Sequence, residues 1–121
     1  MTGQCVLTVG LPQPMLMELL EQVETTDCQI VSAMSLADAR WIALHRSFRV
    51  IVIDMSHVDY QDMPAFTEVL AGKEGIRMIA LNEQITLKSS QVENVIHLRS
   101  DSPVKIAELV CSLLANKAAY D

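Results

Sequence analysis

Five short apolar segments are spaced along the chain, and each predicts a β-strand. They are CVLTV (5–9), QIVSA (29–33), RVIVID (49–54), IRMIAL (76–81) and NVIHL (94–98). The third and fourth segments do not alternate between apolar and polar residues, which is typical of strands covered on both faces in a parallel sheet. The pattern therefore predicts a mostly parallel sheet of five strands.

The segments between these strands carry apolar residues three and four positions apart, as on one face of a helix. The stripes are Leu16, Leu19, Leu20 and Val23; Ala39, Ile42 and Ala43; Met63, Phe66, Val69 and Leu70; and Ile106, Leu109, Val110, Leu113 and Leu114. Residues 83–93 have the weakest pattern, because Thr86, Ser89 and Ser90 disfavour a helix there. We expect Trp41, in the second helix, to pack in the core together with the methionines.

Strands and helices alternate along the whole chain, which is typical of a doubly wound α/β fold. Ser35 followed by Asp38 predicts the start of the second helix, and Ser102 followed by Pro103 predicts the start of the last one. We therefore expect residues 1–121 to form one domain, with a five-stranded parallel sheet in the strand order 2-1-3-4-5. Such a domain is compatible with a small whole protein or with a regulatory part of a longer chain.

Charge and composition argue against several classes of function. The formal net charge is −6, so the chain has no basic field that would hold a nucleic acid. No apolar run is long enough to cross a membrane, and the N-terminus does not resemble a signal peptide, so we expect a cytoplasmic location. The three cysteines are widely spaced among apolar neighbours, which favours reduced, buried thiols over disulfides or a metal cluster.

Motifs for catalysis and cofactor binding are absent from the sequence. The first strand-to-helix turn, VGLPQP, lacks the Gly-rich or Ser/Thr-rich loop that holds the phosphate of a nucleotide or flavin. The cysteines have no neighbouring His and lie in no nucleophile motif. Asp54, His57, Asp59 and Asp62 match no rigid ligand spacing, which favours a solvated loop over a metal site. We expect neither an enzyme nor a bound cofactor.

The carboxyl ends of the strands form the functional edge of an open α/β sheet. Here they carry Gly10, Leu11, Asp54, Asn82 and Arg99. With five βα units and an aspartate that closes the third strand, the whole chain resembles a response-regulator receiver domain, with its flavodoxin/CheY-like fold. The resemblance places Asp54 at the phosphoacceptor, Asn82 at the switch Ser or Thr, and Arg99 at the fifth-strand Lys. It places Gly10 and Leu11 where receivers carry the acidic pair that binds magnesium.

This departure from the receiver pattern bears on phosphorylation. A phosphoryl group transferred to Asp54 would bring a dianion beside a carboxylate, and a divalent cation held by further carboxylates normally neutralises that charge. Neither Gly10 nor Leu11 has a side-chain oxygen. The chain thus resembles a pseudo-receiver, which acts without phosphorylation in bacterial signal transduction or transcription control. It is similar to the N-terminal domains of VpsR- and FleQ-type transcriptional activators, where the motif I-D-x-S-H also follows the third strand.

Other interpretations stay open. Asp54 could still be phosphorylated in a degenerate pocket, or it could be a strand-end carboxylate that caps the turn through Ser56 and His57. The stretch IDMSHVDYQD is also similar to a motif of STAS domains, the fold of anti-sigma-factor antagonists, although Met63 and Pro64 follow where those domains carry a regulatory Ser. A small-ligand-binding α/β module is a further class.

The receiver resemblance also implies an interaction face, formed by the fourth helix, the fifth strand and the fifth helix. In this chain the face would include Ile85, Leu87, Lys88, Val92, Arg99, Lys105 and Glu108. We expect it to bind a protein partner or an output domain, and a homodimer is one such partner. Since residues 83–93 form a poor autonomous helix, they would either gain order from that partner or be mobile alone.

Overall fold

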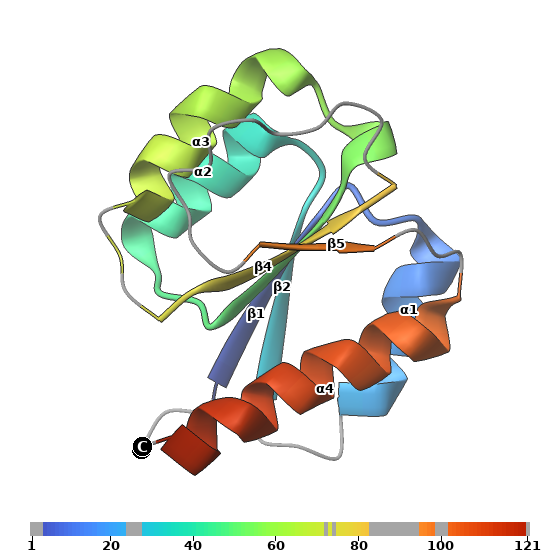
Figure 1. The fold of residues 1–121 in the computed structure, drawn as a ribbon. Helices are drawn as coiled ribbons and strands as arrows, with labels where there is room; N and C mark the ends of the chain where they lie inside the picture. The colour runs from blue at the N-terminus through green and yellow to red at the C-terminus, as the bar shows by residue number, and fades with distance from the viewer. Residues whose placement is uncertain are drawn as a thin grey trace.

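The computed structural model describes residues 4–23, 28–71, 73, 75–82, 95–98 and 102–120. A five-stranded sheet runs through this part of the chain in the order β2-β1-β3-β4-β5 (Figure 1). The strands are β1 (Gln4–Val9), β2 (Cys28–Ala33), β3 (Val50–Asp54), β4 (Arg77–Leu81) and β5 (Val95–Leu98). All neighbouring strands are parallel, which confirms the predicted doubly wound α/β fold and its strand order.

Helices cover both faces of the sheet (Figure 1). On one side lie α1 (Gln13–Val23) and α4 (Pro103–Tyr120), and on the other lie α2 (Leu36–His45) and α3 (Met63–Ala71). Two 3-10 turns, η1 (Met55–His57) and η2 (Tyr60–Asp62), connect β3 to α3. The weak helical pattern over 83–93 falls outside the described residues. None of the described helices is both long enough and apolar enough to span a membrane.

The central strand β3 is buried along its whole length. Val50 and Val52 pack in the cluster under α1 and α4, whereas Ile51 and Ile53 pack in the cluster under α2 and α3. Each such side chain contributes about 1.5–3 kcal/mol through its burial. Two-sided burial explains why this segment does not alternate in sequence, and it fixes the position of Asp54 at the end of the strand.

Helix α2 confirms one local prediction and overturns another. Its cap is Ser35, whose Oγ accepts a hydrogen bond from the backbone N–H of Asp38 at 3.1 Å. The helix lies on the sheet through small residues that include Ala39 and Ala43, both buried. Trp41 stands two positions from each, on the opposite side of the helix, and is 64% exposed. The prediction that Trp41 packs in the core is therefore wrong.

Helix α1 also buries a slightly different face from the one predicted. Its buried row is Met15, Leu19 and Val23, at i, i+4 and i+8, while Leu20 is 40% exposed and Met17 is 51% exposed. The row spaced by four residues faces the sheet and α4, which turns Leu20 toward solvent. Hydrophobic spacing located the helix correctly but did not fix its rotation about its own axis.

Candidate functional site

Asp54 closes β3, and its side chain is only 2% exposed. Because β3 lies between β1 and β4, the carboxylate sits in the middle of the carboxyl edge of the sheet. A buried carboxylate is costly unless hydrogen bonds replace the water that it has lost. The groups that bind Asp54 therefore decide what it can do.

The loop after β3 supplies those hydrogen bonds. Oδ1 of Asp54 accepts from the backbone N–H of Ser56 at 3.1 Å and from the Ser56 hydroxyl at 2.6 Å. Oδ2 lies 3.0 Å from Nδ1 of His57, and the His57 side chain is 56% exposed. Because a carboxylate oxygen accepts, the His57 tautomer that makes this bond carries its proton on Nδ1. The predicted capping of the turn through Ser56 and His57 is present.

Gly10 lies at the neighbouring strand end, because β1 and β3 are paired with Val9 opposite Ile53. Gly10 has a φ of 72°, in the left-handed region that favours glycine. A Cβ added there would lie 3.3 Å from Cγ1 of Val58 and 3.4 Å from Cβ of His57. The loop that binds Asp54 thus lies directly against Gly10, the residue for which the receiver resemblance predicts an acidic equivalent.

Leu11 follows Gly10 at the end of β1, and its side chain has no oxygen that could bind a cation. Its half-buried side chain packs against the apolar cluster under α1 and α4. Magnesium takes oxygen ligands in a near-octahedral arrangement. Gly10 and Leu11 offer no side-chain oxygen, and both oxygens of Asp54 are engaged by Ser56 and His57. The residues at this edge do not fit the magnesium site of a receiver domain.

The other acidic residues of the loop do not join Asp54. Oδ1 of Asp59 accepts from the backbone N–H of Gln61 at 2.9 Å, and Asp62 is exposed. In the described part of the chain, no group of three or more His, Cys, Asp or Glu side chains is placed to hold a metal ion. Of the four residues that could have outlined a metal site, only Asp54 and His57 pair through their side chains, whereas Asp62 donates its backbone N–H to the backbone O of Asp59 at 3.0 Å.

The structure describes only some of the remaining predicted site residues. Asn82 follows β4 directly, next to the pairing of Leu81 with Asp54, and adopts a φ of 55°. Lys105 and Glu108 are exposed on α4. The other residues of the predicted interaction face lie outside the described residues: Ile85, Leu87, Lys88, Val92 and Arg99. No pattern in the sequence predicts the contact of Val58 with Gly10, since it joins segments that are far apart along the chain.

Comparison with known proteins identifies the fold. No protein-family model matches the sequence, and no curated protein matches it. The signal receiver domain of an HD domain-containing protein from Pseudomonas fluorescens Pf-5 superposes with a TM-score of 0.71 at 14% identity, covering 97% of this chain and 98% of that one. A CheY-like response regulator receiver domain from Methylobacillus flagellatus gives 0.67 at 18% identity, covering 93% and 99%.

A third match shows that this fold also occurs inside a larger chain. The Francisella novicida lysine decarboxylase LdcF has a TM-score of 0.69 at 14% identity, with 96% of this chain matched to 18% of that one. At such identities the likeness establishes the fold and leaves the function to the site. The chain has the fold of a response-regulator receiver domain, as the resemblance predicted.

Proposed function

We propose that this chain is a pseudo-receiver, a regulatory domain that acts through protein contacts and without phosphorylation of Asp54, in bacterial signal transduction or transcription control. The observation that carries the proposal is Gly10. Its backbone packs against His57 and Val58 at the position where the receiver resemblance calls for a magnesium-binding acid. Without that cation, the charge of an incoming phosphoryl group stays uncompensated beside the Asp54 carboxylate.

The hydrogen bonds of Asp54 support the same proposal. Phosphorylation of either carboxylate oxygen would displace a donor, either Ser56 from Oδ1 or His57 from Oδ2. Hydrogen bonds to charged groups contribute about 1.5–3 kcal/mol each. The modified residue would also have to leave a site that is 2% exposed. Asp54 is better suited to hold the loop in place than to accept a phosphoryl group.

The test is incubation of the chain with acetyl phosphate and magnesium, followed by intact-mass measurement. The expected result is an unchanged mass, while a phosphorylatable receiver domain treated in parallel gains a phosphoryl group. A mass gain that is lost in Asp54→Asn but retained in Asp59→Asn would instead establish the alternative, a phosphorylatable receiver. Asp59 is a suitable control because it is an exposed acid of the same loop.

The proposal assigns the regulatory contact to the face that includes α4, where the receiver resemblance places it. Lys105 and Glu108 are exposed one turn apart on this helix and would meet a protein partner, an output domain or a second copy. The charge reversals Lys105→Glu and Glu108→Lys should weaken such an association, whereas Arg40→Glu, on the exposed side of α2, should not. Sedimentation over a wide concentration range tests the homodimer, and a monomer throughout would rule it out.

The proposed function includes no enzymatic activity and no cofactor. It also includes no direct contact with nucleic acid, which the net charge of −6 would repel. It places the chain in the cytoplasm, where bacterial response regulators work. The STAS-like and ligand-binding alternatives receive less support, because the receiver fold matches the chain over nearly its whole length.

A further inference from the structure

Large apolar side chains are exposed at the edge of the sheet, on the opposite side of the molecule from α1 and α4. Met34 is 87% exposed, Trp41 is 64% exposed and Leu44 is 51% exposed. Met34 follows β2, and the other two lie on the outer side of α2. Contrary to the prediction for the methionines, Met34 does not fill the core. Exposed apolar residues that gather in this way typically mark an interaction site.

A cavity of about 310 Å³, open to solvent, lies beside Met34 and Trp41. It is lined by Ser32, Ala33, Met34, Asp38, Trp41 and Ile42. Its volume is at the lower end of the range for ligand-binding pockets, roughly 300–1,000 Å³, and suits one long side chain. Because β2 is the outermost strand of the sheet, an extended segment could lie along β2 while one of its side chains enters the cavity.

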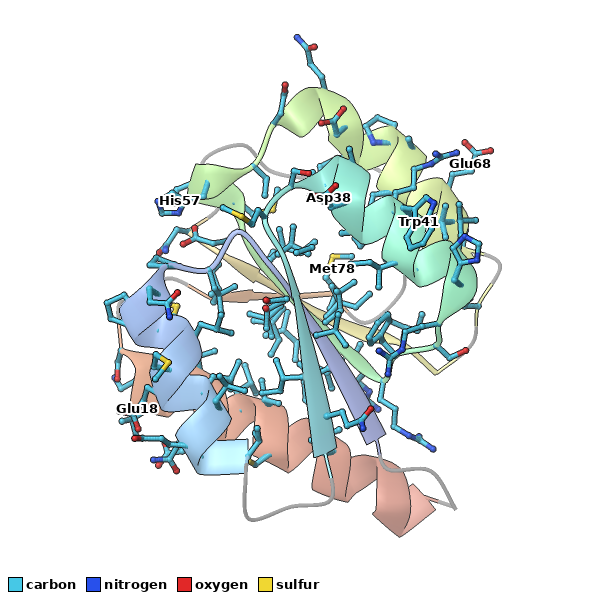
Figure 2. The ribbon with its side chains drawn as sticks, turned by 180° about the vertical axis from the view of Figure 1, so that it is seen from behind. Glu18, Asp38, Trp41, His57, Glu68 and Met78 are labelled. Atoms are coloured by element: carbon cyan, nitrogen blue, oxygen red, sulfur yellow. The ribbon has the colours of Figure 1, made fainter. Side chains whose placement is uncertain are left out.

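The lining combines an aromatic ring with a carboxylate. Asp38 and Trp41 stand one turn apart on α2 (Figure 2), and His45 packs on Trp41 with ring centroids 4.5 Å apart. The backbone N–H of Asp38 donates to Oγ of the N-cap Ser35, but its exposed carboxylate has no hydrogen bond or ion pair within the described part of the chain. An aromatic face beside a carboxylate is suited to a cation, and most of all to a planar guanidinium.

The arginines of the same region do not neutralise Asp38. Arg46 donates from Nη2 to Oε1 of Gln29 at 3.1 Å, and its guanidinium carbon lies 5.9 Å from the ring centroid of Phe48. Arg40 is two positions from Asp38, so the two side chains do not face each other on the helix. A cationic group from outside is therefore free to pair with Asp38, and the net charge of −6 attracts it.

We propose that this cavity binds an arginine side chain of an extended basic segment of a partner protein, with the guanidinium stacked on Trp41 and paired with Asp38. This inference rests on the proposed function in one respect: a regulatory domain that acts through protein contacts needs a site for its partner. Binding at α2 involves neither Asp54 nor α4. Phosphorylation of Asp54 would therefore contradict the proposed function without affecting this proposal. The absence of peptide binding would contradict this proposal without affecting the proposed function.

Trp41 is the only tryptophan of the chain, so its fluorescence reports directly on the cavity. The test titrates the chain with the peptide acetyl-Val-Arg-Val-Arg-Val-amide and with the same peptide carrying citrulline, which has the shape of arginine without its charge. The arginine peptide should change the emission in a saturable way. The citrulline peptide should bind at least about tenfold more weakly, which corresponds to about 1.4 kcal/mol.

Variants of the chain supply the second arm of the test. Asp38→Asn should also weaken binding of the arginine peptide about tenfold, and it keeps the backbone N–H that donates to the N-cap Ser35. Asp62→Asn is the control: it removes an exposed carboxylate in η2, which does not line the cavity. This variant should bind the arginine peptide as the native chain does. Equal binding of the two peptides, or an unchanged affinity of Asp38→Asn, would overturn the proposal. So would an emission that changes with protein concentration alone, since a second copy would then cover Trp41.

Discussion

Nδ1 of His57 lies 3.0 Å from Oδ2 of Asp54, so an exposed ring holds a carboxylate that is itself 2% exposed. The loop that contains His57 packs in turn on Gly10. This is the strand end where the receiver resemblance places the magnesium-binding acids.

Replacement of His57 tests this closure. His57→Ala leaves Oδ2 of the buried carboxylate without its donor, which should lower the free energy of unfolding by about 1–2 kcal/mol. The value lies toward the lower end because water can reach a site whose ring is 56% exposed. Urea denaturation measures the effect. His57→Asn retains a donor and should lose less; an equal loss in both variants would show that the bond to Asp54 contributes nothing.

Gly10→Ala tests the backbone of the first strand end. The residue has a φ of 72°, where an alanine is strained by about 1–2 kcal/mol, and the new methyl group would lie 3.3 Å from Cγ1 of Val58. The variant should therefore unfold at a lower urea concentration. A double-mutant cycle with Val58→Ala separates the two causes, because only the contact with Val58 gives a coupling energy. Full additivity would assign the whole loss to backbone strain.

A substitution at Thr8 should raise the free energy of unfolding, unlike the two substitutions above. Its side chain is 1% exposed, one residue before the end of β1, and its hydroxyl has no hydrogen-bond partner among the described residues. A buried hydroxyl without a partner costs about 1–3 kcal/mol. Thr8→Val keeps the shape and removes the hydroxyl, so it should raise the free energy of unfolding by about 1 kcal/mol. Thr8→Ser keeps the hydroxyl and loses a methyl group, and should be destabilising; a destabilised Thr8→Val would show that the hydroxyl is bound.

The sequence predicted the parallel sheet with helices on both faces because the buried residues of β3 are consecutive apolar residues. Val50, Ile51, Val52 and Ile53 are apolar without alternation, and this is possible only where helices cover both faces. The strand order followed from the βα alternation and the receiver resemblance together. Asp54 could be placed at the strand end for the same reason, since the run of apolar residues stops at it.

What the sequence did not reveal depends on tertiary packing. Gly10 and Val58 come together only when β1 and β3 pair, and no local pattern encodes that contact. Trp41 was misplaced because hydrophobicity favours burial, whereas α2 approaches the sheet through Ala39 and Ala43. Small residues permit the close approach of a helix, and a tryptophan two positions away then points to solvent.

The exposure of Trp41 can itself be tested. Trp41→Ala should change the free energy of unfolding by less than about 1 kcal/mol, because the ring is 64% exposed and its contact with His45 lies at the surface. Phe66→Ala is the matched case in the core, where the side chain is 0% exposed, and should cost about 3–5 kcal/mol. Similar losses in the two variants would contradict the position of Trp41.

Cys111 provides a prediction that depends on pH. Burial raises the pKa of this thiol above its ordinary value, because desolvation disfavours the thiolate. Since the thiolate is the reactive form, alkylation of Cys111 near neutral pH should be slower than that of a free thiol and should accelerate as the pH rises toward the raised pKa. Mass spectrometry of the peptide that contains Cys111, sampled over time, measures the rate.

The same shift has a consequence for stability. The folded chain holds the Cys111 proton more tightly than the unfolded chain does, so this contribution is complete below the ordinary thiol pKa and is lost as the pH rises through the folded value. The difference in unfolding free energy between the native chain and Cys111→Ala should therefore shrink in alkaline solution. A difference that is constant across that pH range, together with alkylation as fast as that of a free thiol, would show that Cys111 is fully solvated.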